Sequence, residues 1–189
     1  MMNEPPPFEA FQSISRLSRN CVVTEKIDGT NGQICVLEDG SVLAGSRTRW
    51  VIPEDDNQGF ARWVAEHADE LRGGLGIGKH FGEWWGAGIQ RRYGLSEKRF
   101  SLFNTARWTA ETKPACCHVV PVLYAGIFSS EIIDRVLVEL VLKGSSAAPG
   151  FMNPEGVVVY HEAARTLFKK TAHGDGHKGE KKTTCPLGT

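Results

Sequence analysis

The chain has 189 residues, of which 22 are basic and 22 acidic, so its formal net charge is zero. This length suits a single domain with a short tail, and a neutral chain does not attract nucleic acid through its overall field. No apolar run approaches the roughly 18 residues that a membrane span needs. The N-terminus also lacks the basic and then apolar pattern of a secretory signal, and we expect no membrane partner.

The first predicted elements are strands. Residues 21–26 form an apolar strand, and residues 33–37 and 42–44 form a hairpin that turns at Glu38-Asp39-Gly40. An amphipathic helix follows, capped by Asp56 or Asn57 and ended by Gly73-Gly74. Its apolar face has helical spacing and consists of Phe60, Trp63, Val64, His67 and Leu71.

The second half of the chain predicts further strands and one more helix. The strands are expected at residues 79–85, 99–106, 119–125, 156–160 and 166–170. The helix starts at Ser129 or Ser130 and ends at Gly144. This order predicts an α+β domain over residues 1–171, with mixed, mostly antiparallel sheets and flanking helices. Residues 172–189 are poor in apolar side chains and are expected to form a flexible tail.

Five cysteines, at positions 21, 35, 116, 117 and 185, are scattered along the chain. Their odd number and irregular spacing are typical of reduced thiols, so we expect an intracellular, cytoplasmic protein. Cys116-Cys117-His118 contains residue types that bind zinc. Adjacent cysteines, however, lack the spacing that closes a tetrahedral site, so we do not expect a zinc centre.

The most informative stretch is Lys26-Ile27-Asp28-Gly29-Thr30-Asn31, directly after the first apolar strand. A lysine amine becomes a nucleophile only after losing its proton, which desolvation and nearby cations favour by lowering its pKa. A strand that ends in an Asp-Gly turn is one way to direct such an amine into a cleft. The alternative is an ordinary turn that carries an exposed lysine.

Six short motifs follow one another in a characteristic order: EKIDGTN at 25–31, SRTR at 46–49, FGE at 81–83, RFSLFN at 99–104, EGVVV at 155–159 and LFKK at 167–170. Together they resemble the motifs of the covalent nucleotidyltransferases, which include DNA ligases, RNA ligases and mRNA capping enzymes. The resemblance implies the ATP-grasp-like adenylation domain of these enzymes. Asn31 is most similar to the RNA ligase branch, especially the nick-sealing RNA-ligase-2-like group.

The resemblance implies ATP as the cofactor and a covalent lysyl-AMP as the intermediate. Lys26 would attack the α-phosphorus and expel pyrophosphate, with Lys169 and Lys170 facing the phosphates. Glu155 would hold Mg²⁺ or Mn²⁺, because a divalent cation offsets the negative charge of the nucleotide. The two lysines are adjacent here, whereas the family often separates them by one residue, which leaves room for only one to point inward.

The resemblance also implies a set of nucleotide-binding residues: Glu25, Ile27, Asn31, Arg47, Glu83 and Phe103. Glu25 would accept a hydrogen bond from the adenine amine, Glu83 would bind a ribose hydroxyl, and Arg47 would bind the ribose or a phosphate. An aromatic ring would stack on the adenine, and spacing does not separate Phe103 from Phe100. Asn104 stands where many members carry aspartate.

The resemblance implies RNA with 5′-phosphate and 3′-hydroxyl ends as the partner of a monomeric enzyme. AMP would pass to the 5′-phosphate before the 3′-hydroxyl is joined. Basic residues between two motifs would hold the RNA backbone: Arg91, Arg92, Lys98 and Arg99. No second ligase domain follows within the chain. The alternatives are a capping-type guanylyltransferase and a catalytically inactive nucleic-acid-binding homologue.

Overall fold

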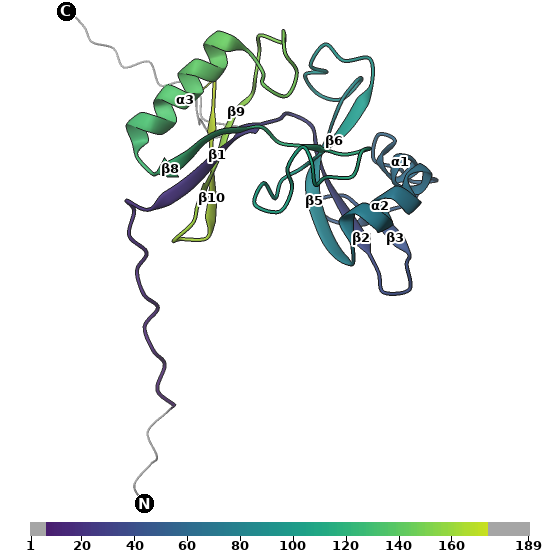
Figure 1. Ribbon diagram of the computed structural model, residues 1–189, viewed down its shortest axis with the longest axis horizontal. Coiled ribbons are helices and arrows are strands. Elements are labelled where there is room, and N and C mark those ends of the chain that lie inside the picture. Colours follow the sequence, from purple (N-terminus) through teal and green to yellow (C-terminus); the bar gives the residue numbers. More distant parts are fainter. Residues whose placement is uncertain (1–6, 174–189) are drawn as a thin grey trace, which may run out of the picture.

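The computed structural model describes residues 7–173, which form two sheets and three helices (Figure 1). The strands are β1 (Asn20–Lys26), β2 (Thr30–Val36), β3 (Val42–Gly45), β4 (Trp50–Val51), β5 (Gly78–Gly86), β6 (Lys98–Leu102), β7 (His118–Val119), β8 (Val122–Ile127), β9 (Gly156–His161) and β10 (Thr166–Thr171). The helices are α1 (Phe60–Glu66), α2 (Ala68–Leu75) and α3 (Ser130–Lys143). The expected tail lies outside the described residues from position 174 onward.

The two sheets occupy separate halves of the molecule (Figure 1). One has four antiparallel strands in the order β10-β9-β1-β8. The other has six strands in the order β4-β3-β2-β5-β6-β7, and among these only β6 and β7 run parallel. The chain passes from one sheet to the other at residues 27–29, so the expected nucleophile lies where the sheets meet. The α+β class and the antiparallel sheets are as predicted.

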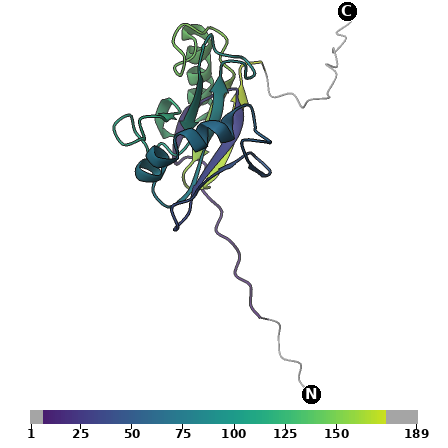
Figure 2. The same ribbon diagram turned by 90° about the vertical axis from the view of Figure 1, so that its right-hand side faces the viewer.

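Each sheet buries one face against helices. α3 packs on the four-stranded sheet, where Ile133, Leu137 and Leu140 meet Cys21, Val23, Val157 and Val159. α1 and α2 cover the six-stranded sheet, and Figure 2 shows them in front of it. A smaller apolar cluster lies between the two halves and consists of Ile27, Trp85, Tyr93, Val120 and Ala148. This cluster fixes the connection that follows Lys26.

The single helix expected after residue 56 is instead two helices. The backbone of His67 is not helical, and its Nδ1 and its N–H lie 2.8 and 3.1 Å from the Trp63 carbonyl, so the chain turns there. Gly73-Gly74 remain inside α2, which was not predicted. The N-cap residue of α1 is Gly59 rather than the predicted Asp56 or Asn57, although the Asp56 carboxylate still accepts the N–H of Ala61 in the first turn at 2.7 Å.

Two predicted strands are shorter than expected. The strand predicted at 99–106 ends at Leu102, because Asn104 opens a turn in which its side chain accepts the Arg107 N–H at 3.1 Å. The strand predicted at 119–125 is divided between β7 and β8 at Pro121, which has no N–H for a sheet ladder. The final hairpin and α3 agree with prediction, and Ser129 caps α3 through the Ile132 N–H.

Within residues 7–173 no helix is both long and apolar enough to cross a lipid bilayer. The same part of the chain contains no cluster of three or more histidine, cysteine or acidic side chains that could hold a metal ion. The four cysteines in this range are free thiols, in agreement with the expected reduced state.

Candidate active site

The site is centred on an ion pair between Lys26 and Glu155. Lys26 ends β1 directly opposite Gly156 of β9, and this register brings the preceding Glu155 beside it. Lys26 Nζ lies 2.6 Å from Glu155 Oε1, with side-chain exposures of 24% and 18%. The other carboxylate oxygen, Oε2, is buried and has no hydrogen-bond partner within residues 7–173. A buried charged oxygen without a partner is costly, so this atom indicates a missing ligand.

The chemistry of Glu155 fits the divalent cation that the sequence analysis expected. Mg²⁺ prefers oxygen ligands and is often held by one or two carboxylates together with substrate phosphates and water. A single buried carboxylate oxygen meets that requirement. The absence of a larger acidic cluster within residues 7–173 indicates that phosphate oxygens would have to complete the coordination.

Glu83 faces the same centre from β5 of the other sheet. Its carboxylate accepts the Gly29 N–H at 3.1 Å and the Asn31 side-chain amide at 3.2 Å. Burial raises its pKa to about 7, while the positive charge of Lys26 and the Gly29 N–H act to lower it. Because the charge of Lys26 acts on Glu83, the two groups lie within electrostatic reach across the junction.

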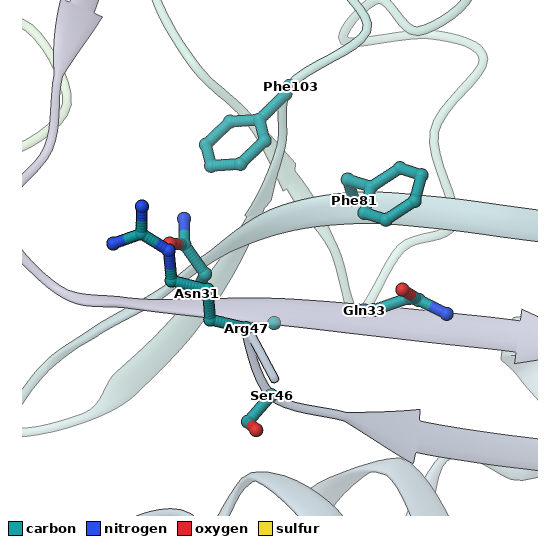
Figure 3. A pocket seen from close by; sticks show the side chains of 7 residues that line it. Asn31, Gln33, Ser46, Arg47, Phe81 and Phe103 are labelled. Carbon is teal, nitrogen blue, oxygen red and sulfur yellow. The ribbon is translucent and has the colours of Figure 1, made fainter. Parts of the chain in front are cut away.

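A shallow cavity of about 160 Å³ lies next to Asn31 (Figure 3). Its walls are Asn31, Gly32, Gln33, Ser46, Arg47, Phe81 and Phe103. The structure therefore brings together Asn31, Arg47 and Phe103, which were expected to share a nucleotide site. A second cavity of about 280 Å³ adjoins it and shares Arg47.

The cavity distinguishes Phe103 from Phe100, which the sequence spacing left as alternatives for stacking on the adenine. Phe103 is 40% exposed and lines the cavity, so its ring is available to a planar ligand. Phe100 is completely buried and packs 5.2 Å from Phe60 in the main core. Of the two, only Phe103 has an accessible ring. Ile27 is also buried, at 4% exposure, so its side chain belongs to the core behind the site.

Glu25 has a different environment from the one expected. Its side chain points to the opposite face of β1 from Lys26 and is 1% exposed. The carboxylate accepts the Ser145 hydroxyl at 2.6 Å and the N–H groups of Ser146 and Ala147 at 2.8 and 2.9 Å. These contacts anchor the loop after α3. The carboxylate that was expected to contact the adenine therefore lies away from Lys26 and binds the protein itself.

The two lysines at the end of the chain's last strand also lie on opposite faces. Lys169 is opposite Val158 in β9 and shares the face of Lys26. Lys170 is opposite Val157, on the face that α3 covers, and forms an ion pair with Asp134 of that helix. Of the two lysines expected to face the phosphates, only Lys169 shares the face of Lys26, and Lys170 lies on the other face of the sheet.

The four basic residues expected to bind RNA do not form one free patch. Arg91 is paired with Asp28 at 2.9 Å, Lys98 donates to the Gln58 carbonyl at 2.7 Å, and Arg99 binds Glu97 at 2.6 Å. Among the four, Arg92 is exposed and has no side-chain partner within the described residues. Three of these four basic side chains therefore bind oxygen atoms of the protein itself.

Two contacts of the segment around Lys26 were not predicted from the sequence. The Tyr93 hydroxyl accepts the Asp28 N–H at 2.7 Å, and Ser145 binds the carboxylate next to the nucleophile. Both lie far from Lys26 in the chain and belong to none of the motifs. Only the folded structure brings them to the site.

The arrangement of two antiparallel-dominated sheets is shared with solved RNA ligases. Three structures from Naegleria gruberi are similar: an RNA ligase mutant with AMP and Mn (18% identity, TM-score 0.60, 83% of this chain and 51% of that one), a mutant with ATP and Mn (18%, 0.60, 82% and 50%) and the ligase with PPi (19%, 0.59, 82% and 50%). At this identity the likeness shows the fold alone. The chain spans about half the length of these proteins.

The family is shown by a separate comparison. The family model described as RNA ligase matches residues 19–171, which is most of the chain. The chain therefore belongs to the RNA ligase family. A comparison with curated proteins found no match.

Proposed function

We propose that this chain is the nucleotidyltransferase domain of an ATP-dependent RNA ligase, with Lys26 as the residue that carries AMP. The observation that supports this most is the half-buried Lys26–Glu155 pair at the junction of the two sheets. The Oε2 atom of Glu155 is buried and has no hydrogen-bond partner among the described residues, which leaves it available to a ligand. The Naegleria structures with ATP, AMP and Mn make a nucleotide and a divalent cation the natural candidates.

In the first step the unprotonated amine of Lys26 attacks the α-phosphorus of ATP. A phosphorus–nitrogen bond forms, the bond to the β-phosphate oxygen breaks, and pyrophosphate leaves. In the ligand-free protein Glu155 holds this amine in place at 2.6 Å as an ion pair. A divalent cation bound by Glu155 would supply positive charge to the triphosphate. Lys169, on the same face as Lys26, would stabilise the charge that develops on the phosphates.

The remaining residues would bind the nucleoside. Phe103 offers an accessible ring for the adenine, and Arg47 is exposed beside it, so its guanidinium can reach a ribose or a phosphate. Glu83 would bind a ribose hydroxyl, since each of its oxygens accepts only one hydrogen bond from the protein. Asn31 holds one of these oxygens in place.

In the later steps AMP would pass from Lys26 to a 5′-phosphate end of RNA, and a 3′-hydroxyl would then displace it to form the phosphodiester. The chain spans only half the length of its structural relatives, so adenylylation and joining need separate tests.

The test is the intact mass of the protein after incubation with ATP and Mg²⁺ or Mn²⁺. We expect the added mass of one AMP, lost on Lys26→Ala and retained on Lys143→Ala, a lysine on the exposed side of α3. GTP in place of ATP tests the guanylyltransferase alternative. RNA binding without any covalent label would instead support a catalytically inactive homologue.

A further inference from the structure

The loop between β5 and β6, residues 87–97, contacts the segment that follows Lys26 and the segment that precedes Glu155. Its Tyr93 is 2% exposed, and the ring packs edge-on to Trp85 of β5 at 4.9 Å and against Phe151 at 4.6 Å. The Tyr93 hydroxyl accepts the backbone N–H of Asp28 at 2.7 Å. The loop therefore lies directly behind the Lys26–Glu155 pair.

Arg91 of this loop makes the most specific of these contacts. Its Nε donates to Asp28 Oδ2 at 2.9 Å, and its Nη1 donates to the side-chain oxygen of Asn153 at 2.9 Å and to the Asn153 carbonyl at 3.1 Å. The side chain is 22% exposed. A planar guanidinium can bind two partners in fixed directions, which a lysine ammonium does not do.

The two partners of Arg91 lie on the two segments that carry the catalytic pair. Asp28 follows Lys26 closely along the chain, and Asn153 closely precedes Glu155. One side chain thus connects the segment of the nucleophile to the segment of the acid. We propose that Arg91 is a positioning residue that holds Lys26 and Glu155 in the geometry needed for adenylylation, an inference that rests on the proposed function.

The backbone around Arg91 supports a dedicated role. Gln90, Arg92 and Tyr93 have φ angles of 42°, 59° and 52°, in the left-handed region that residues other than glycine rarely adopt. Such conformations persist only where the surrounding contacts hold them, and they concentrate at functional sites. The contacts of Arg91 and Tyr93 hold this loop against the segments around Asp28 and Asn153, in addition to the backbone hydrogen bonds within the loop.

These contacts also distinguish a positioning role from the RNA contact expected from the sequence. The Nε and Nη1 donors of Arg91 are already directed at protein oxygens rather than at a phosphate. Adenylylation by ATP involves no RNA, so the two roles predict different results in an assay without RNA. Without RNA, loss of a positioning residue lowers the rate of AMP uptake, whereas loss of an RNA-binding residue leaves this rate unchanged.

The experiment measures the rate at which Lys26 takes up AMP as a function of ATP concentration, with Mg²⁺ and without RNA, on the full chain. We expect Arg91→Ala to lower the rate at saturating ATP by about 10- to 100-fold, as small displacements of reacting groups do, with KM for ATP changed less than about threefold. Arg91→Lys keeps the charge opposite Asp28 but not the bridge, and falls between Arg91→Ala and the wild type. The control is Arg135→Ala, an exposed arginine on α3.

Asn153→Ala provides a second, independent measurement. It removes the side-chain bond but keeps the backbone one, so we expect a smaller loss, of about two- to fivefold. The double variant Arg91→Ala/Asn153→Ala should be no slower than Arg91→Ala alone, because both changes break the same link. Circular dichroism identifies any variant that does not fold. If Arg91→Ala does not fold, the AMP-uptake rates of Arg91→Lys and Asn153→Ala test the positioning role instead.

The inference is overturned if Arg91→Ala takes up AMP at the wild-type rate, even if RNA joining falls, since that result supports the RNA contact. It is also overturned if only KM for ATP rises, or if Arg91→Lys and Asn153→Ala both react like wild type. A wild-type protein that takes up no AMP would count against the proposed function itself. That result is distinguishable from a failure of the Arg91 inference, in which the wild type takes up AMP and the variants react at the same rate.

Discussion

The charged side chains on the two faces of the four-stranded sheet differ in how completely the protein pairs them. On the face covered by α3, Glu25 has three hydrogen-bond donors and Lys170 has the carboxylate of Asp134. On the open face, Lys26 is paired with Glu155, whose second oxygen has no partner. The charged groups on the covered face are paired by other protein groups, whereas on the open face Glu155 Oε2 has no partner among the described residues.

This difference follows from the two-residue repeat of a strand. Neighbouring residues point to opposite faces, so Glu25 cannot share the site of Lys26, and Lys170 cannot share the face of Lys169. Two residues of one motif can therefore have unrelated roles. Substitutions that alter one face at a time test this separation.

The largest effect is expected from Glu25→Ala on the covered face. The change leaves the donors of Ser145, Ser146 and Ala147 without their acceptor. A buried donor without a partner costs about 1–3 kcal/mol, and those of Ser146 and Ala147 are only part-buried, so the free energy of unfolding should fall by about 3–5 kcal/mol. Urea unfolding measures this loss. Glu25→Gln, which keeps one acceptor oxygen, should lose less. A variant of unchanged stability that no longer takes up AMP would restore the adenine contact.

Lys169→Ala on the open face should act on chemistry rather than on stability. Removing one preorganised positive group near the phosphates should slow AMP uptake by about 10²- to 10³-fold. The side chain is exposed on an edge strand, so urea unfolding should be nearly unchanged. Single-turnover AMP uptake by the intact protein is the measurement. A rate within about twofold of wild type would remove Lys169 from the site.

Most strands and the final helix could be predicted because their apolar residues follow the spacing that is typical of strands and helices. The same alternation could have excluded Glu25 from the nucleotide site, since it adjoins the nucleophile on a predicted strand. The pairing of Lys26 with Glu155 depends on the register of β1 and β9, which the motifs suggested only through the family resemblance. The Arg91 bridge could not be predicted, because its loop uses left-handed residues that are not glycine.

Glu83 should make the stability of the protein depend on pH. Its folded pKa of about 7 lies above its ordinary value of 4.5, so the folded state binds the proton more tightly than the unfolded state. Its contribution to stability is therefore complete below pH 4.5, is lost as the pH rises towards 7, and amounts to about 3 kcal/mol. Glu83→Gln should flatten this part of the curve.

The measurement is the free energy of unfolding of the wild type and of Glu83→Gln between pH 5 and pH 8, a range flanking the pKa of about 7. The variant should be the more stable protein at pH 8, and should bind ATP less well because the ribose contact is altered. Parallel curves for the two proteins would show that the carboxylate is not held in a desolvated position. The open face would then resemble the covered one in satisfying its charges.

The smallest effect is expected from Lys170→Ala, which makes the comparison with Lys169 sharpest. Lys170 and Asp134 are half-exposed, and pairs of this kind contribute about 0–1 kcal/mol. AMP uptake should stay within about threefold of wild type, because the Lys170 side chain lies on the face that α3 covers, away from Lys26. Asp134→Ala should give the same small loss in urea unfolding, and the double variant should add nothing further. Slow uptake in Lys170→Ala but not in Asp134→Ala would mean that the last strand turns when ATP binds, so that the face seen here is not the one used in the reaction.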